Sequence, residues 1–247
     1  MDWQGSGILL SARPHGEHAA ILEVFTPGHG RHAGLLHGGQ SRRKTPWLQP
    51  GNVLSLGWRA RLADHVGAYT AELERDRAAR LMGSRLTLAG LGAVTGVLSY
   101  ALPDRLPLPA LYDATAELLD VMALTPAWPL LYLRWELKLL ESLGYGLELD
   151  RCAVFGTNEE LCFVSPRTGR AVSRQAAGDW ADRLLPLPPC LRGEGPAPDA
   201  EIALALSTTG HFLRRHVTPQ WTGQPFPGSR DRLIDLLRRG HSAGAEV

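Results

Sequence analysis

The spacing of apolar residues changes once along this chain, near Arg75, and this change limits the possible folds more than any other feature. Before it, short apolar stretches alternate with polar residues and are separated by turn signals such as Pro27-Gly28-His29-Gly30. After it, apolar residues recur every three or four positions, which is the spacing of amphipathic helices. The pattern predicts an α+β protein with a β-rich domain over residues 1–74 and a mostly α-helical domain over residues 75–247.

The β-rich domain is expected to contain five short strands. They are predicted at residues 7–13, 19–25, 31–37, 53–62 and 65–73. So many short strands in so little chain favour a small barrel, because closing the sheet removes its exposed edges. A barrel of the oligonucleotide-binding (OB) type fits this count, and an SH3-like barrel fits it nearly as well.

The helical domain is expected to contain seven helices. They are predicted at residues 75–87, 88–101, 111–124, 127–143, 179–185, 204–217 and 229–239. The clearest is the one at 127–143, where Leu133, Leu137 and Leu140 share one stripe. Residues 150–178 interrupt this periodicity, since they are polar and punctuated by glycine, and we expect them to form a small insertion.

The composition is that of a globular protein, because 44% of the 247 residues are hydrophobic and 21% are charged. No apolar run approaches the length that spans a bilayer, so no membrane association is expected. The first residues have neither the charged start nor the apolar stretch of a signal peptide, and a cytoplasmic location is the expectation. Three cysteines, an odd number, argue against a disulfide framework.

A compact basic loop, Gly38 to Lys44, lies between two of the predicted strands. The chain as a whole is nearly neutral, with a formal net charge of +1, yet residues 2–61 hold seven Lys or Arg against three acids, and five of the nine histidines. A small β module with a basic face is typical of a polyanion-binding protein. A solvated loop without a binding role is the alternative, and composition alone favours neither.

The candidate nucleic-acid-binding residues are the basic side chains of this module together with one aromatic residue. They are Arg31, Arg42, Arg43, Lys44, Arg59, Arg61 and Trp58. Guanidinium forks and ammonium groups suit phosphate oxygens, and an indole ring stacks on bases. Trp47, which follows Pro46, is expected to pack in the core or at a hinge instead.

The motifs of an enzyme are missing from the sequence. Lys44-Thr45 resembles the end of a phosphate-binding P-loop, but Arg43 stands where that motif requires glycine. No convergent set of titratable residues suggests acid–base or nucleophilic chemistry. We therefore expect a binding protein that makes and breaks no covalent bonds.

Seven segments, in this order, resemble one known family. They are Trp3 to Leu10 followed by His15-Gly16-Glu17, Phe25 to Gly30, Gly38 to Arg43, Leu48 to Gly51, Arg134 to Tyr145, Leu149 to Gly156, and Leu213 to Leu237. Together they resemble RecO, a family of bacterial recombination mediators and DNA-repair proteins, and the likeness covers essentially the whole chain.

The resemblance implies an OB barrel at the N-terminus, a helical domain after it, and a role in DNA repair and homologous recombination. Proteins of this family bind single- and double-stranded DNA and anneal complementary strands. With RecR they help place RecA on DNA coated by single-strand-binding protein, whose acidic tail they also bind. A second basic pair, Arg214 and Arg215, is a candidate for that tail or for DNA. An OB-fold RNA-binding protein of another pathway is the alternative.

Many members of the family hold zinc through two C-x-x-C pairs, and the resemblance places those pairs within residues 150–178. Here the first pair retains only Cys152, and the second reads Ser173-Arg174-Gln175-Ala176. A structural zinc site needs four nitrogen or sulfur ligands, so no metal and no other cofactor is expected. We expect Cys152 to be a small buried hydrophobe, and apolar packing, of residues such as Phe155, Leu161 and Phe163, to replace the metal.

Overall fold

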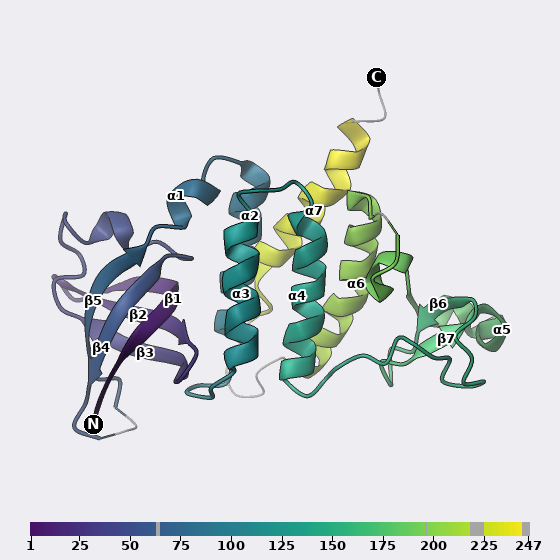
Figure 1. Ribbon diagram of the computed structural model, residues 1–247, viewed down its shortest axis with the longest axis horizontal. Coiled ribbons are helices and arrows are strands. Elements are labelled where there is room, and N and C mark those ends of the chain that lie inside the picture. The colour runs from purple at the N-terminus through teal and green to yellow at the C-terminus, as the bar shows by residue number, and fades with distance from the viewer. Residues whose placement is uncertain (63–64, 196, 218–224, 244–247) are drawn as a thin grey trace. The chain divides into compact units, whose positions relative to one another are not determined.

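The computed structural model describes residues 1–62, 65–195, 197–217 and 225–243 (Figure 1). The protein is α+β, as the sequence predicts, with strands first and helices after them. By packing, it divides into two compact units, one of Met1–Thr125 with Pro227–Arg230 and the other of Pro126–Phe226 with Asp231–Val247. The three helices that follow the strands therefore belong to the same packing unit as the strands.

The first unit is built around a closed five-stranded barrel with the strand order β1-β2-β3-β5-β4. Its strands are β1 (Asp2–His15), β2 (Ala19–Thr26), β3 (Gly30–Leu36), β4 (Val53–Arg59) and β5 (Ala68–Arg75). All neighbours are antiparallel except β3 and β5, which are parallel. The barrel is closed there by two residue pairs, Leu35 with Ala68 and Leu36 with Tyr69.

Strand β2 is buried on both of its sides, and this explains why six of its eight residues are apolar. Leu22 and Val24 belong to the barrel core. Phe25 points the other way and packs edge-on against Tyr112 of helix α3, with ring centroids 5.5 Å apart. Glu23, on the same outer side, is also buried. Helices therefore cover the outer face of β2 and give the first unit a second apolar layer.

Three helices follow the barrel in the first unit: α1 (Ala78–Leu81), α2 (Arg85–Ala101) and α3 (Pro109–Val121). The segment expected to be one helix at 75–87 is divided between two, because β5 continues to Arg75, α1 ends at Leu81, and Ser84 caps the start of α2 by accepting from the Leu86 N–H. The start of α1 is capped from the barrel. The side-chain oxygen of Asn52 accepts from the N–H groups of Arg77 and Ala78, both at 2.9 Å.

The second unit contains α4 (Trp128–Ser142), α6 (Asp199–His216) and most of α7 (Gly228–Ala243). Helices α4 and α6 pack together, and the buried carboxylate of Glu136 accepts a hydrogen bond from Thr209 between them. The expected insertion at 150–178 supplies β6 and β7 of a three-stranded sheet in the order β7-β6-β8, and β8 follows it where a helix was expected to end. Its strands and the short helices nearby are β6 (Leu161–Val164), β7 (Ala171–Ser173), α5 (Arg174–Ala177), η2 (Gly178–Arg183), β8 (Leu185–Pro186) and η3 (Pro189–Arg192). Among the residues that the structure describes, no helix is both long and apolar enough to cross a membrane.

Candidate nucleic-acid interface

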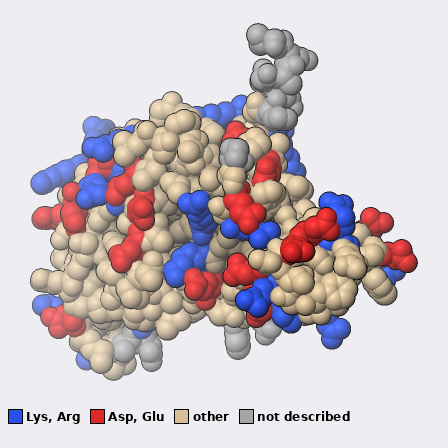
Figure 2. All heavy atoms as spheres, turned by 45° about the vertical axis from the view of Figure 1, so that its right-hand side comes forward, with Lys and Arg blue, Asp and Glu red and all other residues tan. Residues whose placement is uncertain are grey.

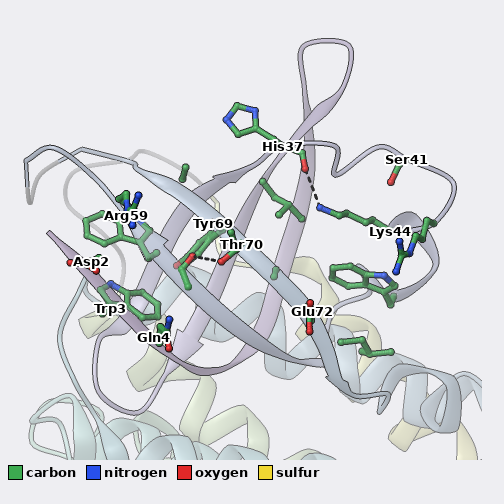
Figure 3. Close-up of a pocket in the computed structure, with 18 residues that line it drawn as sticks. Asp2, Trp3, Gln4, His37, Ser41, Lys44, Arg59, Tyr69, Thr70 and Glu72 are labelled. Carbon is green, nitrogen blue, oxygen red and sulfur yellow. Dashed lines mark hydrogen bonds between the residues drawn. The ribbon is translucent and has the colours of Figure 1, made fainter.

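A groove of about 1000 Å³ runs along the barrel, between strands β4 and β5 and the loop that follows β3 (Figure 3). Its floor includes the small residues Gly57 and Ala68, and Thr70, whose hydroxyl donates to the Gly57 carbonyl at 3.3 Å. Strand β5 is paired with β3 only as far as Tyr69. The residues that follow, 70–73, line the groove. The groove therefore follows the part of β5 that β3 does not cover.

The basic loop forms one wall of this groove and is ordered by its own hydrogen bonds. The Ser41 carbonyl accepts from the N–H of Lys44 at 2.9 Å and from the N–H and hydroxyl of Thr45, both at 3.0 Å. The Lys44 ammonium donates to the His37 carbonyl at 3.1 Å. These turns lead into the short helix η1 (Thr45–Trp47). The loop is thus an ordered turn.

Arg42 and Arg43 are the most available cations of the loop. Both side chains are exposed, and Arg43 lines the groove together with the half-buried Lys44. Within residues 1–62, 65–195, 197–217 and 225–243, no carboxylate forms an ion pair with either arginine. Exposed guanidinium groups without an internal partner are free to meet an external anion.

Arg59 is exposed and lines the groove, and Arg61, also exposed, follows it two residues later without lining the groove. Figure 3 shows Arg59 beside Asp2, with Lys44 on the opposite side of the view. Glu72, which also lines the groove, is exposed on β5. The groove therefore carries cations on two sides and carboxylates within it, so phosphates would meet its rims rather than its β5 wall.

Charge elsewhere on the molecule is mixed. On the face drawn in Figure 2, basic and acidic side chains are interspersed, in keeping with the formal net charge of +1. A polyanion must therefore be attracted by local groups such as the basic loop, because a neutral chain offers no strong overall field.

Comparison with known proteins agrees with the resemblance seen in the sequence. The model described as Recombination protein O N terminal matches residues 1–75, and the model described as Recombination protein O C terminal matches residues 82–224. The chain belongs to the RecO family. It is 56% identical over 239 residues to the DNA repair protein RecO of Ruegeria sp. (strain TM1040), covering 97% of this chain and 99% of that relative. It is 50% identical over 239 residues to the DNA repair protein RecO of Jannaschia sp. (strain CCS1), covering 97% of each.

In this RecO-family chain Arg31 does not join the exposed cations, contrary to its place in the predicted DNA-binding set. Its guanidinium lies 2.7 Å from Glu23 and 2.6 Å from Asp104, and it also donates to the Ser99 carbonyl at 2.9 Å. Two carboxylates neutralise this side chain and hold it against helix α2. We therefore leave Arg31 out of the proposed binding surface.

Trp58 is likewise a core residue and not a stacking surface. Its side chain is 4% exposed, and its indole N–H donates to the Val66 carbonyl at 2.9 Å. Two other tryptophans, Trp3 and Trp47, are half-buried and line the groove. Trp3 stacks on His29 with ring centroids 4.3 Å apart. Trp47 packs against the barrel core, as the sequence reasoning expected, and it also lines the groove. Trp3, which packs against the same core, was not among the predicted binding residues.

Arg214 and Arg215 lie at the end of α6 in the second unit, and both make contacts within that unit. Arg214 forms an ion pair with Asp231 at 2.6 Å and lies over the ring of Phe226. Arg215 donates to the Pro166 carbonyl at 2.7 Å. These contacts give both arginines a role in holding the second unit together.

The residues at the expected position of the zinc module do not fit a metal. Cys152 is buried, and its sulfur accepts from the N–H of Ser173 at 3.4 Å, with the Ser173 hydroxyl at the same distance. Burial alone would raise the pKa of the Cys152 thiol, but hydrogen bonds from Ser173 and from the backbone at Phe155 and Val154 lower it to about 7. In the described part of the chain, no group of three His, Cys, Asp or Glu residues is placed to hold a metal ion.

The apolar packing expected in place of the metal is confirmed only in part. Leu161 is buried, and Phe163 is partly buried on strand β6. Phe155 is 53% exposed, so it does not fill the position that a metal would occupy. Hydrogen bonds between Cys152 and Ser173, rather than a packed phenyl ring, connect this part of the insertion.

Proposed function

We propose that this protein acts in DNA repair and homologous recombination by binding single- and double-stranded DNA and annealing complementary strands. The closed five-stranded barrel is proposed to be an OB-fold, a type of barrel that binds oligonucleotides with a strand face and its adjoining loops. The exposure of Arg42 and Arg43, with no internal carboxylate beside them in the described chain, is the observation that carries the proposal.

Most of the affinity for DNA would come from contacts between basic side chains and the phosphate backbone. Each phosphate that Arg42, Arg43, Lys44, Arg59 or Arg61 neutralises releases condensed counterions, so affinity falls as salt rises. The half-buried Trp47 lines the groove beside these cations, and an unpaired base would stack on the face of its indole ring whatever the sequence of the strand. Such a surface needs no catalytic residue, and we propose that the protein is not an enzyme and uses no cofactor.

The proposed partners follow from membership of the RecO family. With RecR, the protein would help place RecA on DNA coated by single-strand-binding protein, working in the cytoplasm at the nucleoid. Arg214 and Arg215 stay candidates for the acidic tail of the coating protein, because both are only partly covered by their intramolecular contacts.

The test is a salt titration of binding to bare single-stranded DNA. The double variant Arg42→Ala/Arg43→Ala should reduce the slope of log affinity against log salt by about 1.4, which is about 0.7 for each phosphate that is no longer neutralised. Adding Lys44→Ala should reduce it by up to about 0.7 more. A matched control is Arg80→Ala/Arg85→Ala, which removes two exposed arginines from helices α1 and α2 of the same unit.

A slope that is unchanged in Arg42→Ala/Arg43→Ala, or reduced as much in the control, would remove the basic loop from the binding surface. An annealing assay with complementary DNA strands, compared with RNA strands of the same sequence, separates this function from that of an RNA-binding OB protein. Annealing of RNA alone would favour the RNA-binding alternative.

A further inference from the structure

Gln40 attaches the turn between β1 and β2 to the basic loop through three hydrogen bonds. The side-chain amide of Gln40 donates to the Gly16 carbonyl at 2.8 Å and to the Ala19 carbonyl at 2.9 Å. Its backbone N–H donates to the His18 carbonyl at 3.4 Å. Both amide hydrogens are thus committed to the turn, and Gln40 immediately precedes Ser41 and Arg42 of the loop.

The turn that Gln40 holds carries its own basic side chains. His18 is exposed in the turn itself, with its ring 3.9 Å from the Glu17 carboxylate, and Arg13 and His15 are exposed at the end of β1 that leads into the turn. Gly16 takes a left-handed conformation, with φ of +58°, which lets the chain turn tightly enough to direct its carbonyl at Gln40. Arg13 has no ion-pair partner among the described residues, so its charge is available to an external anion.

We propose that Gln40 joins this turn to the basic loop so that the two form one phosphate-binding surface, with Arg13 as a further DNA-binding residue and Gln40 as a positioning residue. The inference rests on the proposed DNA binding by the barrel. Without Gln40 the turn and the loop could move relative to each other and would lose that freedom on binding, whereas two segments already joined lose less. The attachment through Gln40 would therefore raise affinity without contacting DNA.

The test is a double-mutant cycle between Gln40→Ala and Arg13→Ala, read as the salt slope on single-stranded DNA. Arg13→Ala alone should reduce the slope by about 0.7 and weaken binding several-fold. In the Gln40→Ala background the same change should have less than half that effect, because the turn is no longer held beside the loop. Gln40→Ala alone should weaken binding about three- to tenfold, as expected when the stabilisation from about one hydrogen bond is removed.

Gln49→Ala is the matched control. Gln49 lies in the same connection, and its amide donates to the Thr45 carbonyl at 3.4 Å, within the loop and away from the turn. It should change neither the salt slope nor the effect of Arg13→Ala. Hydrogen exchange should accelerate over residues 14–19 in Gln40→Ala but not in Gln49→Ala.

Independent, multiplicative effects of Gln40→Ala and Arg13→Ala would overturn the inference, as would an unchanged slope in Arg13→Ala. If Arg42→Ala/Arg43→Ala still lowers the slope in that case, the proposed DNA surface stands and only the roles given to Gln40 and Arg13 are wrong. If neither arginine set changes the slope, the proposed function itself fails.

Discussion

A carboxylate oxygen of Glu23 on β2 lies 2.7 Å from a guanidinium nitrogen of Arg31 on β3, and the pair is held against helix α2. The hydroxyl groups of Ser99 and Ser11 donate to the same carboxylate at 2.9 and 3.2 Å. Glu23 is buried, so removing its cation would leave a charge in a poorly solvated place. This pair therefore belongs to the fold of the first unit.

We predict that Arg31→Ala lowers the free energy of unfolding by about 3 kcal/mol, the usual cost of breaking a buried ion pair from one side. The salt slope of DNA binding should stay unchanged in the variant below its melting temperature. Urea unfolding and the salt titration measure the two quantities. Arg42→Ala serves as the opposite case, with a reduced slope and nearly unchanged stability. A normal stability with a lower slope in Arg31→Ala would return this residue to the DNA surface.

Asp120 on α3 should be nearly as important for stability. It accepts from Arg77 at 2.7 and 2.9 Å and from Arg75 at 2.8 Å, and Arg77 is only 6% exposed. Hydrogen bonds and charge from Arg77, and then from Arg75, hold the pKa of Asp120 below its usual value. The stabilisation is therefore present above the pKa of the unfolded chain and is lost as pH falls through the lower folded value.

Asp120→Asn should lower the free energy of unfolding by about 2 kcal/mol at pH 7, somewhat less than for a fully buried pair because Asp120 is partly exposed. Asp113→Asn, on an exposed position of the same helix, should cost less than about 0.5 kcal/mol. Equal stabilities of the two variants in chemical denaturation would contradict the assignment.

His32 makes the stability of the barrel depend on pH in the mildly acidic range. It is buried beside Trp3, Trp58 and Tyr69, and a ring nitrogen lies 2.9 Å from the Tyr69 hydroxyl. Burial, followed by the nearby charges of Arg105 and His29, lowers the pKa of His32 to about 4. In the unfolded chain a histidine takes up its proton near pH 6.5, so the unfolded state binds more protons and stability falls as pH drops from about 6.5 to about 4.

Between pH 7 and pH 5 this one group should remove about 2 kcal/mol of stability. His32→Gln should lose that part of the pH dependence while the contributions of the other eight histidines remain. Parallel unfolding titrations at the two pH values measure the difference. If the wild-type and His32→Gln curves shift equally between pH 7 and pH 5, the ring is not held neutral by the fold.

Metal removal should have no effect on this protein. Because Cys152 is paired with Ser173 rather than with a second cysteine, a chelator such as EDTA should leave the melting temperature within about 1 °C, and elemental analysis should find no stoichiometric zinc. Ser173→Ala should lower the free energy of unfolding by about 1 kcal/mol, with or without chelator, because its hydroxyl no longer bonds to Cys152. A melting temperature that falls on chelation would show that another ligand set exists.

The strands can be predicted because alternation is a local signal. Leu54, Leu56 and Trp58 share one side of β4, and that spacing alone is enough to place Trp58 in the core, although its basic neighbours suggest otherwise. Arg31 cannot be placed in this way. Its second partner, Asp104, lies 73 positions further along the chain, and only the packing of that loop on β3 brings the two together.

The second unit is harder to predict for the same reason. Strands β6, β7 and β8 have four, three and two residues, too few for any periodicity to appear. Helix α6 begins at Asp199, five residues before the expected start at Leu204, because the acidic first turn of Asp199 and Glu201 suits a helix N-terminus. The groove itself depends on how β3 meets β5, a long-range pairing that no local pattern encodes.

Two residue pairs alone join β3 to β5, whereas each of the other four junctions of the barrel has seven. This junction has the fewest residue pairs to break, and Leu36 and Tyr69 of the barrel core lie along it, so parting it would expose part of the hydrophobic interior. We therefore expect the barrel to part first along this junction, beside the groove, when its strands are pulled away from one another.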